Sequence, residues 1–180
     1  MIIARIASLL IGYIFGLFQT AYIYGKSKGI DIRKEGSGNA GTTNSLRVLG
    51  GKAGAVTFLG DLFKAIFAVL LIKLIFTNTY ADATKVLELY AGFGSVLGHN
   101  FPFYLQFKGG KGIACTSGAI LAVCPLAAPI CLILFILAVA TTRYVSLGSI
   151  LVVISYLIQA IVFGQLGYLH LEGTALVEFY

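Results

Sequence analysis

A series of long apolar runs, interrupted by short polar segments, constrains this chain more than any other feature. Runs such as Ile2–Tyr24 and Ala53–Phe76 match the roughly 20 apolar residues that a helix needs to span a bilayer. Only 11% of the residues are charged, against roughly 25% in ordinary soluble domains. A soluble fold of 180 residues cannot bury that much apolar surface. The sequence therefore predicts an all-α, polytopic membrane protein that forms one domain over residues 1–180.

The spacing of the runs predicts a seven-helix bundle, with six complete spans and the start of a seventh at Thr174–Tyr180. We expect the six spans at Ile2–Tyr24, Ala53–Phe76, Lys85–Leu97, Ile113–Val123, Leu126–Ala140 and Leu147–Phe163. The third is short and is expected to continue through Phe101 and Tyr104 as an interfacial end. The fourth is too short to span alone unless Lys108–Gly112 begins its helix, and Pro125 separates it from the fifth.

Basic residues predict the orientation of the bundle. The polar segments Gly25–Lys52, Gly98–Gly112 and Thr141–Ser146 fall on one membrane side, where they carry Lys26, Lys28, Arg33, Lys34, Arg47, Lys52, Lys108, Lys111 and Arg143. The other side has only three basic residues near it, namely Arg5, Lys73 and Lys85. Because cytoplasmic loops carry the excess of Lys and Arg, we expect these three segments in the cytoplasm and the N-terminus outside. Short loops of this kind do not form a nucleic-acid-binding surface.

The first polar motif, GSGNAGTTNSLR at Gly36–Arg47, contains a GxGxxG pattern. A dinucleotide-binding fingerprint needs a buried strand before it, whereas the preceding residues here, Asp31–Glu35, are mostly charged and lie between membrane spans. The glycines still permit close approach of the backbone to a ligand, and Arg47 offers a planar guanidinium suited to phosphate. The motif indicates an anion site, the alternative being a solvated loop with turn residues.

The second motif is Gly98–Thr116, in which Lys108 and Lys111 bracket two glycines and Gly112 follows. It is not a Walker A loop, because Ile113 stands where a Ser or Thr would hold magnesium. A helix that starts near Gly112 would point its N-terminal N–H groups at the loop and favour phosphate there. The alternative is a cytoplasmic lysine loop that merely follows the charge rule.

Three further features carry open alternatives. His99 is either a general base or a residue that orients its loop through hydrogen bonds. Asp61 and Lys64 lie three residues apart in the second span, where charges are costly and usually paired, so we expect them to neutralise each other, the alternative being a direct role at the site. Ser146 is a candidate N-cap of the sixth span, and Ser149, one turn later, would share its face.

The spacing of cysteines and histidines does not predict a metal centre. Cys115, Cys124 and Cys131 lie in or beside apolar runs, where free cysteines behave as small buried residues. No CxxC occurs, and His99 and His170 are far apart in sequence, so zinc-site spacing is missing. We expect no metal and no cofactor.

Together with RYVSLGS at 143–149, the two long motifs closely resemble, in order and spacing, those of the bacterial membrane acyl-phosphate:glycerol-3-phosphate acyltransferase family. The resemblance runs from the first span through the sixth. It implies a seven-helix inner-membrane enzyme with its N-terminus outside and its active site toward the cytoplasm. It also implies transfer of a fatty acyl group from acyl phosphate to the 1-hydroxyl of glycerol 3-phosphate, giving lysophosphatidic acid. We expect a monomer whose partners are these two substrates and the bilayer.

The motifs and the resemblance together define a set of candidate site residues. The catalytic candidates are Ser37, Arg47, His99 and Lys111. The residues expected to bind substrate are Gly36, Gly38, Asn39, Asn44, Lys108, Gly109, Gly110, Gly112, Ser146 and Ser149. Both substrates bring phosphates, which the fixed cations would neutralise, and the same cations would stabilise a developing oxyanion. Neither histidine begins a His-x4-Asp dyad, so the hydroxyl proton would go to a substrate phosphate or to His99.

The family has a further cytoplasmic motif after its seventh helix, with His, Asn, Arg and Glu, and this chain ends at Tyr180 before it, so we expect the sequence to be truncated. The alternative function is a membrane transporter for a phosphorylated solute, since broken helices around an anion site also suit a carrier. Against it, the motifs lie at one membrane face and no internal repeat is visible.

Overall fold

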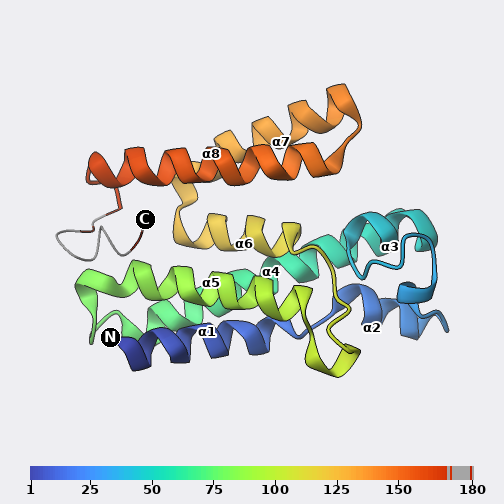
Figure 1. The fold of residues 1–180 in the computed structure, drawn as a ribbon, viewed down its shortest axis with the longest axis horizontal. Coiled ribbons are helices and arrows are strands. Elements are labelled where there is room, and N and C mark those ends of the chain that lie inside the picture. The colour runs from blue at the N-terminus through green and yellow to red at the C-terminus, as the bar shows by residue number, and fades with distance from the viewer. Residues whose placement is uncertain (170, 172–178, 180) are drawn as a thin grey trace.

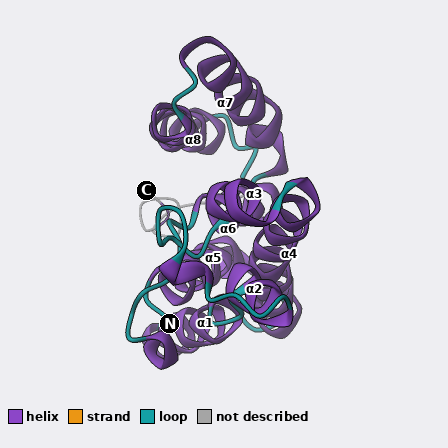
Figure 2. Cartoon of the chain, turned by 90° about the vertical axis from the view of Figure 1, so that its right-hand side faces the viewer, coloured by secondary structure: helices purple, strands orange, loops and turns teal. Residues whose placement is uncertain are grey.

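The computed structural model describes residues 1–169, 171 and 179, and over residues 1–169 its regular elements are all helices. The α-helices are α1 (Ile2–Gly16), α2 (Thr20–Ser27), α3 (Thr42–Leu49), α4 (Gly51–Phe76), α5 (Thr84–Asn100), α6 (Ile113–Val123), α7 (Ala128–Thr142) and α8 (Val145–Gln165). Short 3-10 turns occupy Ile32–Lys34, Ala81–Ala83, Phe103–Leu105 and Pro125–Ala127. The long helices run side by side along one axis (Figures 1 and 2). The prediction of an all-α fold is confirmed.

Within the part of the chain that the structure describes, four helical segments are long and apolar enough to cross a membrane: Ile2–Ser27, Gly51–Phe76, Pro125–Thr142 and Val145–Gln165. The third predicted span appears as α5, which is longer than expected at both ends. The chain leaves this helix before Phe101, and Tyr104 lies in the following 3-10 turn. The predicted beginning of a seventh helix, 174–180, lies outside the described residues apart from Phe179.

The fourth predicted span is a short helix. α6 begins at Ile113 after Gly112, so Lys108–Gly112 does not extend it, and it ends at Val123, just before the expected break at Pro125. Its 11 residues rise about 17 Å, roughly half of the hydrocarbon thickness. α6 is therefore too short to cross a bilayer by itself.

The first predicted span, Ile2–Tyr24, was expected to be continuous, and the structure corrects this. α1 ends at Gly16 and α2 begins at Thr20. Backbone that leaves a helix within a membrane needs other partners for its carbonyls. Gln19, fully buried, donates from Nε2 to the carbonyl of Gly16 at 3.3 Å, and Tyr104 Oη donates to the carbonyl of Leu17 at 2.7 Å. The break is thus stabilised by side chains, one of them from a distant segment.

Glycines allow α1 and α5 to pack backbone against backbone. Gly12 and Gly16 on α1 face Gly94 and Gly98 on α5, each pair spaced four residues apart. A methyl group at any of these positions would clash with a backbone carbonyl of the opposite helix. Small-xxx-small spacing of this kind brings membrane helices into close contact. It places the end of α5, and with it His99, firmly beside the break in the first span.

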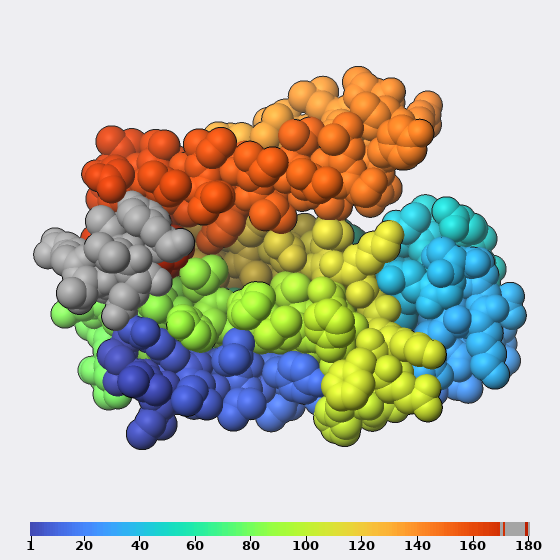
Figure 3. All heavy atoms as spheres, viewed as in Figure 1, coloured from blue at the N-terminus to red at the C-terminus, as the bar shows by residue number. Residues whose placement is uncertain are grey.

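α7 and α8 form a separate hairpin over the rest of the bundle (Figure 1). Gly148 of α8 packs against Phe135 and Val139 of α7. The three cysteines are buried, as predicted. In the space-filling view, a notch separates the α7–α8 hairpin from the end of the molecule that carries α2 and α3 (Figure 3).

Candidate functional site

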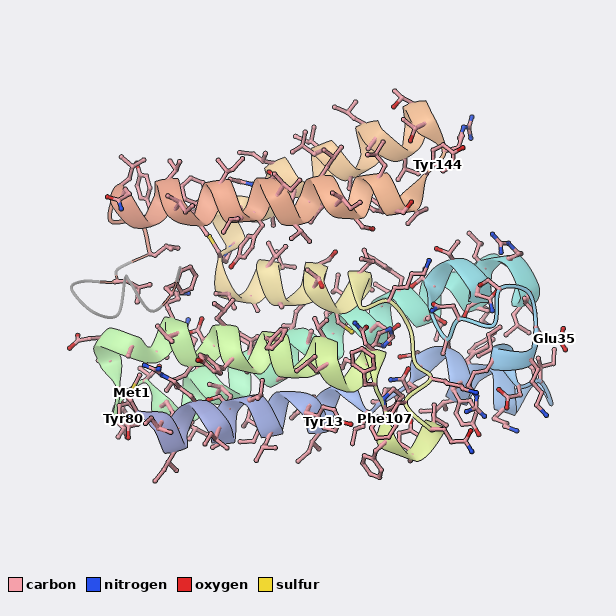
Figure 4. All side chains as sticks on the ribbon, in the orientation of Figure 1. Met1, Tyr13, Glu35, Tyr80, Phe107 and Tyr144 are labelled. Carbon is pink, nitrogen blue, oxygen red and sulfur yellow. The ribbon has the colours of Figure 1, made fainter. Side chains whose placement is uncertain are left out.

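The three sequence motifs lie toward the same end of the molecule. Glu35, Phe107 and Tyr144, which adjoin or belong to the three motifs, lie toward one end of the helices, whereas Met1 and Tyr80 mark the other (Figure 4). Asn39 of the first motif also donates from Nδ2 to the carbonyl of Gly109 in the second, at 3.5 Å. The prediction that the motifs gather on one face is borne out by this arrangement.

A cavity of about 540 Å³ lies where the motifs meet, bounded by α3, α4, the end of α5, the start of α6, α7 and the start of α8. The predicted site residues that line it are Ser37, Asn39, Asn44, Arg47, His99, Lys111, Gly112, Ser146 and Ser149. All four catalytic candidates are among them. The remaining candidates, which do not line the cavity, are Gly36, Gly38, Lys108, Gly109 and Gly110.

The side chain of Asn44 holds the backbone of the first motif through hydrogen bonds. Its side chain is buried, and its Nδ2 donates to the carbonyls of Ile32 at 3.2 Å and Glu35 at 3.0 Å. Its Oδ1 accepts from the backbone N–H of Ser37 at 2.9 Å. Gly36 has a φ of 58° and packs against Asn44 Oδ1, so a larger residue there would be both strained and crowded. Asn44 and Gly36 thus position Ser37 at the cavity.

Arg47 and Lys111 are the unpaired cations of the cavity. Both are exposed, and within the described part of the chain neither forms an ion pair with a carboxylate. By contrast, Arg33 is held by Asp31, with Nη2 2.8 Å from Oδ2, and this hydrogen-bonded ion pair lowers the pKa of Asp31 to about 2. Arg47 and Lys111 are therefore free to bind an anion that enters the cavity, since cations and phosphates form charge-assisted hydrogen bonds.

The glycines of the second motif have a packing role that differs from the expectation. Gly109 and Gly110 do not leave their N–H groups free for a ligand, because these donate to the carbonyls of Asn100 at 3.2 Å and His99 at 3.1 Å. A methyl group on either glycine would clash with His99. Gly112 precedes α6 with a φ of 76°. Ile113 and Ala114 in the first turn of α6 line the cavity, and the N–H groups of a first helical turn have no intrahelical partner.

A buried ionic cluster borders the cavity. Lys64 Nζ lies 2.9 Å from Asp61 Oδ1, which confirms the predicted pairing. The same ammonium is 2.9 Å from His99 Nδ1 and donates to the carbonyl of Phe18 at 2.6 Å. Thr20 Oγ1 donates to Asp61 Oδ1 at 3.1 Å. The pair is thus part of a larger network that includes a catalytic candidate and the break between α1 and α2.

The third motif contributes serines, although not in the predicted way. Ser146 is not an N-cap, since α8 begins at Val145 after Tyr144 and has no side-chain cap. Ser149 Oγ donates to the carbonyl of Val145 at 2.8 Å, a bond within the helix. Ser146 and Ser149 nevertheless both line the cavity, as their predicted shared face requires. A further hydroxyl, Thr42 Oγ1, is buried without a hydrogen-bond partner among the described residues and belongs to a lining residue.

Comparisons with known proteins show the family of this chain. A family model described as glycerol-3-phosphate acyltransferase matches residues 6–179. The chain belongs to this family. A glycerol-3-phosphate acyltransferase of Clostridioides difficile (strain 630) is 47% identical over 154 residues, covering 83% of this chain and 73% of that protein. One from Shouchella clausii (strain KSM-K16) is 40% identical over 163 residues, covering 90% and 78%.

Two crystal structures of a family member are also similar. Both are of PlsY (YgiH), an integral membrane glycerol 3-phosphate acyltransferase. Its glycerol 3-phosphate form has a TM-score of 0.77 and 31% identity and covers 97% of this chain and 86% of that one. Its lysophosphatidic acid form has a TM-score of 0.77 and 32% identity and covers 97% and 84%. This acyltransferase-family chain is accordingly an integral membrane protein.

Sequence reasoning missed the apolar wall of the cavity in this family member. Phe58 of α4, Phe135 of α7 and Ile150 of α8 line it together with the polar groups. Each lies inside an apolar run, where residue type does not distinguish a cavity wall from a lipid-facing surface. Asp61 also lines the cavity, and the rarity of charge within a span was a usable signal for it.

Proposed function

We propose that this chain transfers a fatty acyl group from acyl phosphate to the 1-hydroxyl of glycerol 3-phosphate, giving lysophosphatidic acid and phosphate. Family membership supports acyl transfer to glycerol 3-phosphate. The observation that carries the proposal is the pair of unpaired cations, Arg47 and Lys111, lining a cavity that also has apolar lining residues. Both proposed substrates carry phosphate groups and one carries an acyl chain, so a site with both cationic and apolar lining suits them together.

The chemistry needs little from the protein beyond binding and charge stabilisation. Acyl phosphate is a mixed anhydride, so the hydroxyl oxygen of glycerol 3-phosphate attacks the acyl carbon, and the bond from that carbon to the phosphate oxygen breaks. The phosphate leaves with the bonding electrons, and the hydroxyl proton passes to a phosphate oxygen of a substrate. Lys111 and the free N–H groups of α6 stabilise the negative charge that develops on the acyl oxygen. Holding both substrates in one cavity supplies much of the remaining rate.

The polar lining orients the two substrates in this proposal. Arg47 binds a phosphate through its planar guanidinium. Ser37, placed by Asn44, and Thr42, with its unpartnered hydroxyl, offer hydrogen bonds from the first motif. Ser146 approaches from the other side, on the α7–α8 hairpin. The substrates therefore contact residues of both the helix bundle and the α7–α8 hairpin.

The orientation we propose places this end of the molecule in the cytoplasm, in the inner membrane, with the N-terminus outside. The support is the distribution of Lys and Arg between the two sides, which follows the positive-inside rule. Glycerol 3-phosphate is a soluble anion, so a cytoplasmic opening gives it direct access to the cations. We propose that the enzyme acts as a monomer, since all the cavity-lining groups come from one chain.

One reconstitution experiment tests the proposal. The purified protein in lipid vesicles is incubated with labelled glycerol 3-phosphate and acyl phosphate, and lysophosphatidic acid and phosphate are measured. We expect both products in equal amounts, and none when acyl-CoA or acylated carrier protein replaces acyl phosphate. Uptake of label into the vesicles without a lipid product would instead support the transporter. Lysophosphatidic acid formed from acyl-CoA alone would support glycerol-3-phosphate acyltransferase activity but contradict acyl phosphate as the donor.

A further inference from the structure

Lys64 is the buried charge that the proposed reaction does not use. It lies within the membrane-spanning helix α4, and its side chain is only 5% exposed. An ammonium in this setting is costly and needs hydrogen-bond acceptors. A lysine has three N–H donors, and the structure provides three acceptors: Phe18 O at 2.6 Å, Asp61 Oδ1 at 2.9 Å and His99 Nδ1 at 2.9 Å. Charge neutralisation alone would require only Asp61.

The groups near the Lys64 ammonium resemble a set of metal ligands. Asp61, His99 and Cys115 offer ligand atoms that lie within 4.8 Å of one another, and all three are buried. Carboxylate, imidazole and thiolate groups at such distances suit a transition metal. Here Lys64 Nζ lies 2.9 Å from two of them. The chain's own cation therefore contacts two of these three groups.

The contact with Lys64 determines which nitrogen of His99 carries the proton. A charged ammonium donates and cannot accept, so Nδ1 of His99 must be the acceptor, and the neutral ring then has its proton on Nε2. Nε2 faces the second motif, because a methyl group on Gly110 would clash with it. A protonated ring would put a second cation beside Lys64. The ring therefore presents an N–H, and not a free lone pair, to Gly110 of loop 108–112, and neither ring nitrogen is left to act as a general base.

His99 also supports this loop through its backbone. Its carbonyl accepts from Gly110 N at 3.1 Å and from Gln19 Nε2 at 3.0 Å. The ring and the carbonyl of one residue therefore contact the loop that presents Lys111 to the cavity. Any rotation of the His99 ring would disturb the packing of Gly110 and shift that lysine.

We propose that Lys64 is a positioning residue: its ammonium fixes the tautomer and orientation of His99, and His99 in turn holds loop 108–112 in the shape that places Lys111. The kinetic consequence rests on the function proposed above, whereas the tautomer does not. Lys64 does not line the cavity, so it shapes the anion site through His99 without touching substrate.

The first test measures the tautomer directly and needs no turnover. The chain contains two histidines, His99 and His170, so ¹⁵N-histidine labelling in lipid nanodiscs gives two pairs of ring signals, one from Nδ1 and one from Nε2 of each ring, and a His170→Gln variant assigns them. At pH 7 we expect the His99 signal of a neutral ring protonated on Nε2. A ring protonated on Nδ1, or a doubly protonated ring, would overturn the proposal. If the protein makes no lysophosphatidic acid, the proposed function fails while this measurement still decides the role of Lys64.

The second test removes the ammonium without leaving a buried charge. In the Asp61→Asn, Lys64→Met double variant both ionic groups are replaced by neutral ones of similar size, so the fold is expected to persist. We expect the His99 tautomers to become mixed and the KM for at least one phosphorylated substrate to rise by roughly tenfold, with a smaller change in kcat. Lys73→Met, the same change on the exposed part of α4, is the matched control and should alter neither. A double variant with the wild-type tautomer and wild-type KM values contradicts the proposal.

Discussion

Two kinds of cation serve the same cavity, and they differ in what surrounds them. Arg47 and Lys111 are exposed at the lining and have no carboxylate partner among the described residues, whereas Lys64 is buried and its three donors are all used. An unpaired cation keeps its binding capacity for a ligand, while a saturated one can only hold its neighbours in place. The comparison separates substrate binding from positioning, and variants of the two groups should fail in different ways.

The largest effect on activity is expected from the unpaired cations. Arg47→Ala or Lys111→Ala should reduce kcat/KM by on the order of 100–1,000-fold or more, because each removes a fixed charge that binds phosphate or stabilises the oxyanion. The proteins should remain folded, since neither side chain is buried. Steady-state turnover of acyl phosphate with labelled glycerol 3-phosphate checks this.

Lys108→Ala is the matched control for Lys111→Ala. Both lysines flank the same two glycines, but Lys108 does not line the cavity. We expect its loss to change kcat/KM by less than about fivefold. Wild-type turnover in Lys111→Ala, or equal losses in the two lysine variants, would show that the cavity has been assigned to the wrong residues.

The largest effect on stability is expected from the saturated cation. Lys64→Met leaves Asp61 buried without its ion pair, and breaking a buried pair in this way costs about 3–5 kcal/mol. Lys111→Met should leave stability unchanged within about 0.5 kcal/mol, as is usual for exposed positions. The three cysteines are all free and buried, so a thiol-reactive fluorophore reports unfolding on heating in one detergent. If Lys64→Met and Lys111→Met unfolded at the same temperature, the contrast between the two cations would be lost.

Gly110 connects the two groups, and its replacement should have an intermediate effect. In Gly110→Ala the added methyl meets the His99 ring, so the ring or the loop must move and carry Lys111 with it. We expect kcat/KM to fall by roughly 10–100-fold, with little loss of helix content by circular dichroism. Gly51→Ala is the control, since nothing lies within 4 Å of the added carbon and its backbone is helical. Full activity in Gly110→Ala would contradict the proposal that His99 positions Lys111.

The residues that sequence reasoning located are those whose chemistry is unusual for a membrane protein. Polar motifs stand out against apolar runs, and for this reason Ser37, Arg47 and Lys111 could be named from the sequence alone. Helix positions followed from the same contrast, since roughly 20 apolar residues suffice to span a bilayer. The pairing of Asp61 with Lys64 followed from the cost of charge inside a span.

What sequence reasoning missed depends on tertiary contacts, most of them between distant segments. The break after Gly16 is stabilised by Gln19 and by Tyr104, which lies 87 residues from the carbonyl of Leu17 that it satisfies. The role of His99 was left open because its neighbour Lys64 is 35 residues away along the chain. Phe58 resembles the other apolar residues of α4, and only its position at the cavity distinguishes it. Local patterns predict elements, whereas tertiary partners decide what each element does.

Arg33 provides a third case and the smallest expected effect, because it is a cation already paired outside the spans. Neither Arg33 nor Asp31 lines the cavity, so Asp31→Asn should leave kcat unchanged and lower stability at pH 7 by no more than about 1 kcal/mol.

Hydrogen bonding to Arg33 lowers the pKa of Asp31 from 3.8 to about 2. A lowered carboxyl pKa stabilises the fold fully above the ordinary value, and this contribution is lost as the pH falls toward 2. Thermal unfolding at a series of pH values should therefore show a wild-type advantage at pH 5–7 that vanishes between pH 4 and 2. A gap of constant size over this range would mean that Asp31 acts through packing, and the distinction between paired and unpaired cations would then lose one of its three examples.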